Sequence, residues 1–286
     1  MTSLWRSWLV VLFLTIASAC KAQDAPPIEA STNGAPTETR ATADAPDGPL
    51  SSGDEKIDAL LDRLEARGKS VLGLKSKLTY THVIVDPVES RKVKEGELLF
   101  ARAEPNYRFY VHFDRHIADG VVSRSGEYFA FDGRWLIERN DRAKNVIKRE
   151  LAREGQYRDP FKLGEGPFPL PFGQRRGDML KNFRVSLEPF AIGDPLQTDH
   201  LRCVPRPGTD LAKRYSRVDI YIDRRIDLPV RIVTENLKDG NRIEVDFKDI
   251  STGEAPAASR FAIEEPKDYD IRVERLDDSP EDGAAP

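Results

Sequence analysis

Asn106-Tyr107-Arg108-Phe109-Tyr110-Val111-His112-Phe113-Asp114 is the stretch that decides the fold, because its large apolar residues recur at every second position. Successive side chains of a β-strand point to opposite faces of the sheet. Tyr107, Phe109, Val111 and Phe113 therefore share one face, with Arg108, Tyr110 and His112 on the other. The stretch predicts a β-strand with one apolar face.

The same period of two continues on both sides of this strand. Asp132-Gly133-Arg134 and Asp239-Gly240 are typical of tight turns between paired strands. Because no helical crossover separates neighbouring strands, we expect an antiparallel meander and disfavour a parallel α/β sheet. The other predicted strands are 75–85, 92–102, 126–131, 135–139, 145–150, 184–188, 199–204, 216–223, 229–235, 242–249 and a short apolar piece at 260–263.

Helical periodicity appears before the strands and once among them. Asp54-Glu55-Lys56 opens a helix whose apolar residues are Ile57, Leu60, Leu61 and Leu64, and Gly68 marks its end. Asp58 and Asp62 are expected on its solvated face. A short second helix is predicted at 176–182.

The N-terminus has the pattern of a secretory signal. Arg6 precedes an apolar run that ends in Ala17-Ser18-Ala19-Cys20, which suits a signal peptidase and resembles a bacterial lipobox with Cys20 as the lipidated residue. Plain secretion is the alternative. We expect a signal peptide at 1–20, a disordered tether at 21–53, one folded domain at 54–276 and a loose acidic tail at 277–286.

Composition and motifs exclude several classes of function. A net charge of -4 in 286 residues argues against a nucleic-acid-binding surface. Cys203 is the only cysteine besides Cys20 and is expected to be a buried strand residue. The sequence has no Gly-x-Ser-x-Gly elbow, P-loop or His-Glu-x-x-His helix. We therefore predict no catalytic residue and no cofactor.

Two polar clusters are weaker candidates for sites. His112 and His116 share a predicted strand, but the sequence places no third ligand beside them, so no metal is predicted. Charged residues at 139–142 and at 224–225 are interpreted as turn and surface charges in preference to phosphate clamps.

The order of these elements resembles the LolA/LolB-like superfamily of outer-membrane lipoprotein carriers and receptors. The matching pieces follow the first helix and cover most of 54–273. They are Glu95-Gly96-Glu97-Leu98-Leu99-Phe100, Glu104-Pro105-Asn106-Tyr107-Arg108-Phe109, Phe131-Asp132-Gly133-Arg134-Trp135, Asp227-Leu228-Pro229, and Phe261-Ala262-Ile263 with Pro266.

The resemblance implies an α+β, mostly β fold: a strongly curved antiparallel half-barrel sheet with helices covering its concave face. It also implies a hydrophobic cavity that binds acyl chains of lipids or lipoproteins without catalysis. Carriers of the family have an arginine implicated in lid closure directly before the Pro-Asn pair. Here Glu104 occupies that position and Arg102 lies two residues earlier.

Large apolar side chains on the concave face could line the cavity or form an ordinary solid core. The candidates for the cavity lining are Leu98, Phe100, Tyr107, Phe109, Val111, Phe113, Phe129, Phe131, Val218, Ile220, Ile222, Ile232, Val245 and Phe247. The candidates for its rim or lid are Leu61, Leu64, Phe168, Leu170 and Phe172.

The leading hypothesis is a cell-envelope protein of lipoprotein localisation, held on the periplasmic side of the outer membrane by a lipid at Cys20. Its expected partners are acyl chains, the membrane and an envelope protein, without nucleic acid. The alternative is an envelope-stress regulator similar to the RseB family, which senses lipid or protein and binds a membrane partner. A lipid-anchored enzyme is a third class, and it would need convergent polar residues in the cavity.

Overall fold

The structure is a computed structural model that describes residues 50–103, 106–153 and 175–276. The chain divides into two units, Met1–Asp47 and Gly48–Pro286, and all described residues belong to the second. Within the described part, no helix is both long enough and apolar enough to cross a bilayer.

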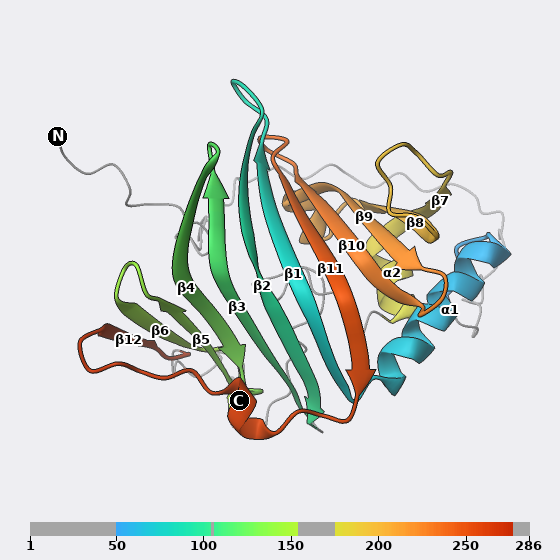
Figure 1. The fold of residues 1–286 in the computed structure, drawn as a ribbon. Helices are drawn as coiled ribbons and strands as arrows, with labels where there is room; N and C mark the ends of the chain where they lie inside the picture. The colour runs from blue at the N-terminus through green and yellow to red at the C-terminus, as the bar shows by residue number, and fades with distance from the viewer. Residues whose placement is uncertain (1–49, 104–105, 154–174, 277–286) are drawn as a thin grey trace, which may run out of the picture. The chain divides into compact units, whose positions relative to one another are not determined.

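One 12-stranded sheet dominates this unit, in the order β12-β6-β5-β4-β3-β2-β1-β11-β10-β9-β8-β7 (Figure 1). The two ends of this order are not paired with each other, so the sheet is open, and Figure 1 shows it curving. The strands are β1 Gly73–Ile84, β2 Ser90–Ala103, β3 Asn106–Ala118, β4 Val121–Phe131, β5 Trp135–Asn140, β6 Asn145–Glu150, β7 Phe183–Glu188, β8 Thr198–Pro205, β9 Tyr215–Asp223, β10 Leu228–Asn236, β11 Arg242–Gly253 and β12 Asp270–Glu274.

The predicted open, mostly β architecture is confirmed, and two details of it are wrong. Residues 260–263 do not form a strand, because Ala258–Phe261 is a short 3-10 helix, η2, whose Phe261 packs on Leu99 and Ala101. β12 was not predicted, and it pairs with β6 in parallel, whereas the other paired strands are antiparallel.

A β-bulge in β2 helps the sheet to curve. The register of β2 against β3 shifts between Glu95 and Gly96. A Cβ atom at Gly96 would lie 1.8 Å from the carbonyl oxygen of His112, so only glycine allows this approach of the two backbones. A bulge bends its strand and increases the local twist, which favours a curved sheet.

Helix α1 (Glu55–Ser70) begins where its sequence predicts, because the Asp54 side chain accepts a hydrogen bond from the Lys56 amide. Helix α2 (Arg176–Asn182) has the predicted bounds. Both helices contact β7, and α1 also contacts β10. A second 3-10 helix, η1, spans Leu211–Lys213.

Candidate functional site

The inner face of the sheet, defined here as the face that carries the main apolar cluster, is built by alternate residues of neighbouring strands. On its β2–β4 half, Phe100 pairs with Phe109 and Phe109 pairs with Phe131. The next row pairs Leu98 with Val111 and Val111 with Phe129. Because the register aligns these residues across three strands, they form a continuous apolar surface.

Aromatic rings add specific contacts to these rows. Phe109 stacks on Phe131 with 5.9 Å between the ring centroids, and Phe113 meets Phe129 edge to face at 6.3 Å. The half-buried Tyr107 lies 5.8 Å from Phe100. Such pairs favour a defined packing over a loose one.

The β9–β11 half of the inner face is aliphatic. Ile232 pairs with Val245 on one side and with Ile220 on the other. Val218, Ile222 and Phe247 belong to the same buried cluster as the β2–β4 residues. The structure thus brings together every described residue predicted to line the cavity, and buries all of them except Tyr107 almost completely.

Helix α1 contributes to this cluster through Ile57, Leu60, Leu61 and Leu64. Leu61 and Leu64, which the sequence suggests for a rim or lid, are 1% and 3% exposed, so they lie beneath the helix and not at an open rim. Among the other predicted rim and lid residues, Phe168, Leu170 and Phe172 lie outside the described part of the chain, as does Cys20.

Polar contacts hold the edge of α1 to the sheet. Arg67 donates to the Ile226 carbonyl at 3.1 Å and to Thr252 Oγ1 at 3.0 Å. Arg63 pairs with Asp227 at 3.2 Å, although half of its side chain is exposed. Exposed contacts of this kind are individually weak. The helix is therefore fixed by its apolar stripe and by several weak ties along one edge.

Arg102 fixes the C-terminal end of α1. Its guanidinium donates to the carbonyl of Gly68 at 2.7 Å and to Tyr107 Oη at 3.0 Å, and it lies over the Tyr107 ring. The last carbonyls of a helix lack partners within the helix, so this arginine satisfies one of them. Glu104, which replaces the arginine of the carrier family, lies outside the described residues.

Asp58 and Asp62 correct the expectation of a purely solvated helix face. Arg176, the first residue of α2, pairs with Asp58 at 2.9 Å and with Asp62 at 2.8 Å. Hydrogen bonds from Ser51 and Ser52, together with the Arg176 charge, lower the pKa of Asp58 to about 2. Ser51 and Ser52 fall in the predicted tether, yet here they bond to α1. No local pattern signals the contact with Arg176, because its partners are far apart in the chain.

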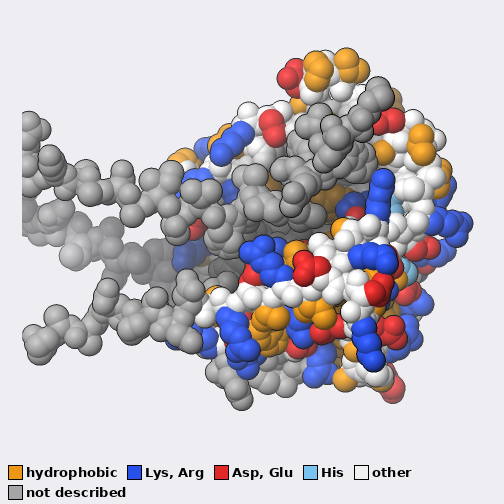
Figure 2. Space-filling model, turned by 90° about the vertical axis from the view of Figure 1, so that its left-hand side faces the viewer, with side chains coloured by type: hydrophobic (Ala, Val, Ile, Leu, Met, Phe, Trp, Pro, Cys, Tyr) orange, Lys and Arg blue, Asp and Glu red, His pale blue; other side chains and the backbone are white. Residues whose placement is uncertain are grey.

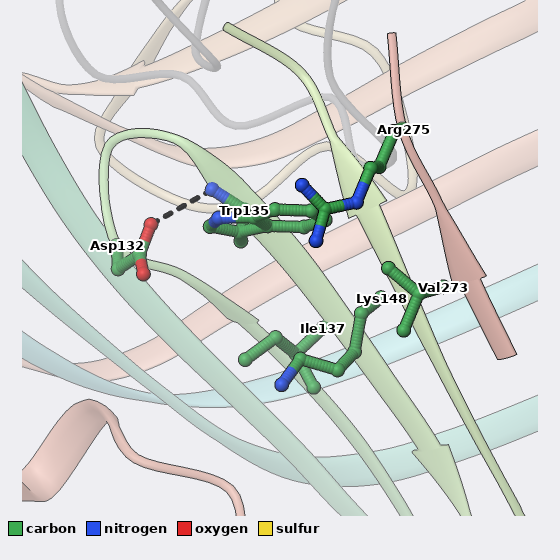
Figure 3. Close-up of a pocket in the computed structure, with 6 residues that line it drawn as sticks. All are labelled: Asp132, Trp135, Ile137, Lys148, Val273 and Arg275. Atoms are coloured by element: carbon green, nitrogen blue, oxygen red, sulfur yellow. Dashed lines mark hydrogen bonds between the residues drawn. The ribbon is translucent and has the colours of Figure 1, made fainter. Parts of the chain in front are cut away.

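Two pockets of about 320 Å³ each lie on the opposite, outer face. In the first, the Arg275 guanidinium lies over the Trp135 ring, with Ile137, Lys148 and Val273 beside it (Figure 3). The second is bounded by η2. Viewed from the β12 end, the surface mixes hydrophobic, basic and acidic side chains (Figure 2). These pockets do not include the residues predicted to line a cavity.

The remaining candidates are structural in this fold. His112 stacks on Tyr128 at 4.3 Å, and His116 Nε2 lies 3.0 Å from the Ser125 carbonyl. Among the described residues, no group of three or more His, Cys, Asp or Glu side chains could hold a metal ion. Cys203 is buried in β8, as predicted, and burial raises the pKa of its thiol.

The charged turns at 139–142 and 224–225 carry ion pairs within the chain. Arg139 pairs with Asp141 at 2.7 Å, and Arg224 pairs with Asp199 at 2.7 Å. The exposed Arg224 agrees with the interpretation as a surface charge. For Arg139 that interpretation is wrong, because this residue lies in β5 and its side chain is only 15% exposed.

No protein-family model matches the sequence, and no curated protein matches it either. Solved structures of similar fold include an uncharacterized conserved protein from Thermus thermophilus, with 10% identity, a TM-score of 0.44, and coverage of 77% of this chain and 99% of that one.

Two further solved structures have a similar fold. A LolA superfamily protein from Nitrosomonas europaea shows 14% identity, a TM-score of 0.35, and coverage of 72% of this chain and 97% of that one. The Pseudomonas aeruginosa MucA/MucB complex shows 16% identity, a TM-score of 0.39, and coverage of 73% and 61%. This chain thus spans about three fifths of the latter. Similarities of this size concern the course of the chain and not what it binds.

Proposed function

We propose that the domain is a non-catalytic cell-envelope protein that binds acyl chains of lipids or lipoproteins between α1 and the inner face of the sheet. The observation that supports this proposal is the inner face itself, a row-by-row apolar surface from β2–β4 to β9–β11 covered in part by a helix with weak edge contacts. An anchor at Cys20 and a role in lipoprotein localisation belong to the same proposal.

Binding between α1 and the sheet requires the helix to move, because its apolar stripe is buried in the same cluster as the inner-face residues. Burial of an acyl chain contributes about 0.8 kcal/mol per methylene group, so about ten groups contribute about 8 kcal/mol. That gain offsets the separation of the α1 stripe from the sheet, which costs about 1.5–3 kcal/mol for each exposed aliphatic side chain. The free energy gained from the bound acyl chain is thus similar to the free energy lost when α1 leaves the sheet. Because the two nearly cancel, the chain can also be released.

The test uses delipidated protein and a fluorescent fatty acid. We expect saturable binding by the natural sequence and weaker binding by Val111→Phe, which fills space at the centre of the β2–β4 rows. Val122→Phe, at an exposed position of β4, is the matched control. Circular dichroism and thermal unfolding show whether each variant is folded.

Absence of saturable binding by the folded natural sequence would contradict the proposal. A pull-down distinguishes the alternative role: many lipoproteins are expected for a localisation protein, whereas enrichment of one membrane protein would indicate the regulator.

A further inference from the structure

The loop between β7 and β8, residues 189–197, exposes three large apolar side chains. Phe190 is 59% exposed, Leu196 is 79% exposed and Ile192 is completely exposed. Single exposed apolar residues are ordinary on protein surfaces, but three within seven positions form a local apolar patch.

This loop is held by its own hydrogen bonds. The Asp194 carboxylate accepts from the Ala191 amide at 2.9 Å, and the Ala191 carbonyl accepts from the Asp194 amide at 3.1 Å. Arg231 donates to the Gly193 carbonyl at 3.0 Å, and Thr198 Oγ1 donates to the Pro195 carbonyl at 2.7 Å. The apolar side chains are therefore presented by a closed, bonded turn.

The base of the loop is also fastened to the outer face of β8 and β9. The largely buried Asp194 carboxylate lies 3.8 Å from His200 Nδ1. His200 bonds to Asp219 at 2.9 Å and stacks on Tyr221 at 4.2 Å. The polar groups of the loop thus contact the protein, whereas the side chains of Phe190, Ile192 and Leu196 are exposed to solvent.

We propose that this loop inserts Phe190, Ile192 and Leu196 into the surface of a lipid bilayer. Its position agrees with such a role, because Leu187, at the end of β7, is 39% exposed and pairs with the buried Leu201 of the inner face.

The N-terminal chain favours a bilayer as the partner. Roughly 30 residues separate Cys20 from Leu50, and a tether of the predicted composition spans about 30 Å. The described chain starts at Leu50, five residues before α1, and α1 contacts β7. A lipid at Cys20, which is part of the proposed function, would therefore keep the loop within reach of the membrane at a high local concentration.

The expected strength of insertion is modest. Partial insertion of an apolar side chain contributes less than its full burial. A single membrane-attachment element gives reversible binding, whereas stable attachment takes two, such as this loop and a lipid at Cys20. Arg224 bonds through its amide to the Gln197 carbonyl at 3.0 Å, while its guanidinium pairs with Asp199. The neighbouring, exposed Arg225 places a guanidinium group beside the loop for lipid phosphates.

The experiment labels the loop with a polarity-sensitive dye. The full chain carries Cys20→Ser, which removes the predicted anchor, and Ile192→Cys. Cys203 is buried and does not compete for the label. With vesicles of phosphatidylethanolamine and phosphatidylglycerol we expect a blue shift and a brighter emission, and none when the dye is placed at the exposed Val121 through Val121→Cys.

A second variant tests the patch without a dye. Phe190→Ser, Ile192→Ser and Leu196→Ser together should lower vesicle partition roughly tenfold or more, as the loss of three apolar groups implies. Val121→Ser and Val122→Ser provide the control and should leave partition unchanged.

No dye shift at position 192, equal shifts at both positions, or a shift that requires membrane protein would overturn the proposal. None of these results depends on fatty-acid binding, so they test membrane insertion independently of the acyl-chain proposal.

Discussion

At the scale of single residues, Arg176 connects the two helices. Its guanidinium contacts Asp58 and Asp62, and its amide donates to Glu65 Oε2 at 2.7 Å. The three acidic residues lie at helical spacing on one face of α1, so one side of the helix receives the start of α2. This contact fixes α1 through charge and hydrogen bonding, whereas its opposite face is held by apolar packing.

Acid should weaken this connection. The pKa of Asp58 is about 2 in the fold, below its usual 3.8, so its contribution to stability is present above pH 3.8 and is lost as the pH falls towards 2. We expect the free energy of unfolding to decrease over that range and to decrease less in Asp58→Asn. Urea unfolding at a series of pH values measures this. The Asp210→Asn variant, whose partner Lys213 belongs to η1, serves as a control for general charge effects; identical pH curves for the natural chain and Asp58→Asn would contradict the assignment.

At the scale of elements, the strands could be predicted largely from apolar residues that recur at every second position. Phe109 and Val111 alternate with polar residues because one face is buried, and this alternation located β3. Its extension to Ala118 was missed because both faces near the hairpin tip are partly solvated. A short apolar run such as 260–263 fits a strand or a packed turn, and only the contact of Phe261 with β2 decides it.

The candidate site, too, could be predicted from the sequence only in part. Alternation predicted which side chains share the inner face, and the structure confirms that they cluster. The connection of Asp58 with Arg176 depends on a contact between distant segments, and no local pattern encodes it.

The edge of α1 should control access to the inner face. Arg67→Ala removes the bonds to Ile226 and Thr252, so we expect a loss of about 1 kcal/mol in stability. If separation of α1 from the sheet becomes easier by the same free energy, a fatty-acid probe should associate up to about fivefold faster. Stopped-flow fluorescence measures this rate.

Lys69→Ala is the matched control for this change. Lys69 pairs with Glu65 of the same helix, so its loss affects α1 but not the contact with the sheet. Equal association rates for Arg67→Ala and Lys69→Ala would show that the helix edge does not limit entry.

At the scale of the whole molecule, an open sheet of 12 strands presents two different faces. The inner face carries the main apolar cluster, to which α1 contributes its apolar stripe, and the outer face carries the base of the β7–β8 loop. Under the two proposals above, the inner face would keep a lipid chain from water while the β7–β8 loop rests against a membrane.

Photolabelling tests the central claim most directly. A fatty acid with a photoreactive group near its methyl end is bound to the full chain and activated, and the modified peptides are identified by mass spectrometry. We predict labels on inner-face residues of β2–β4 and on the apolar stripe of α1, with suppression by unlabelled fatty acid. Labels confined to the outer face around Trp135, or none that unlabelled fatty acid suppresses, would contradict the account.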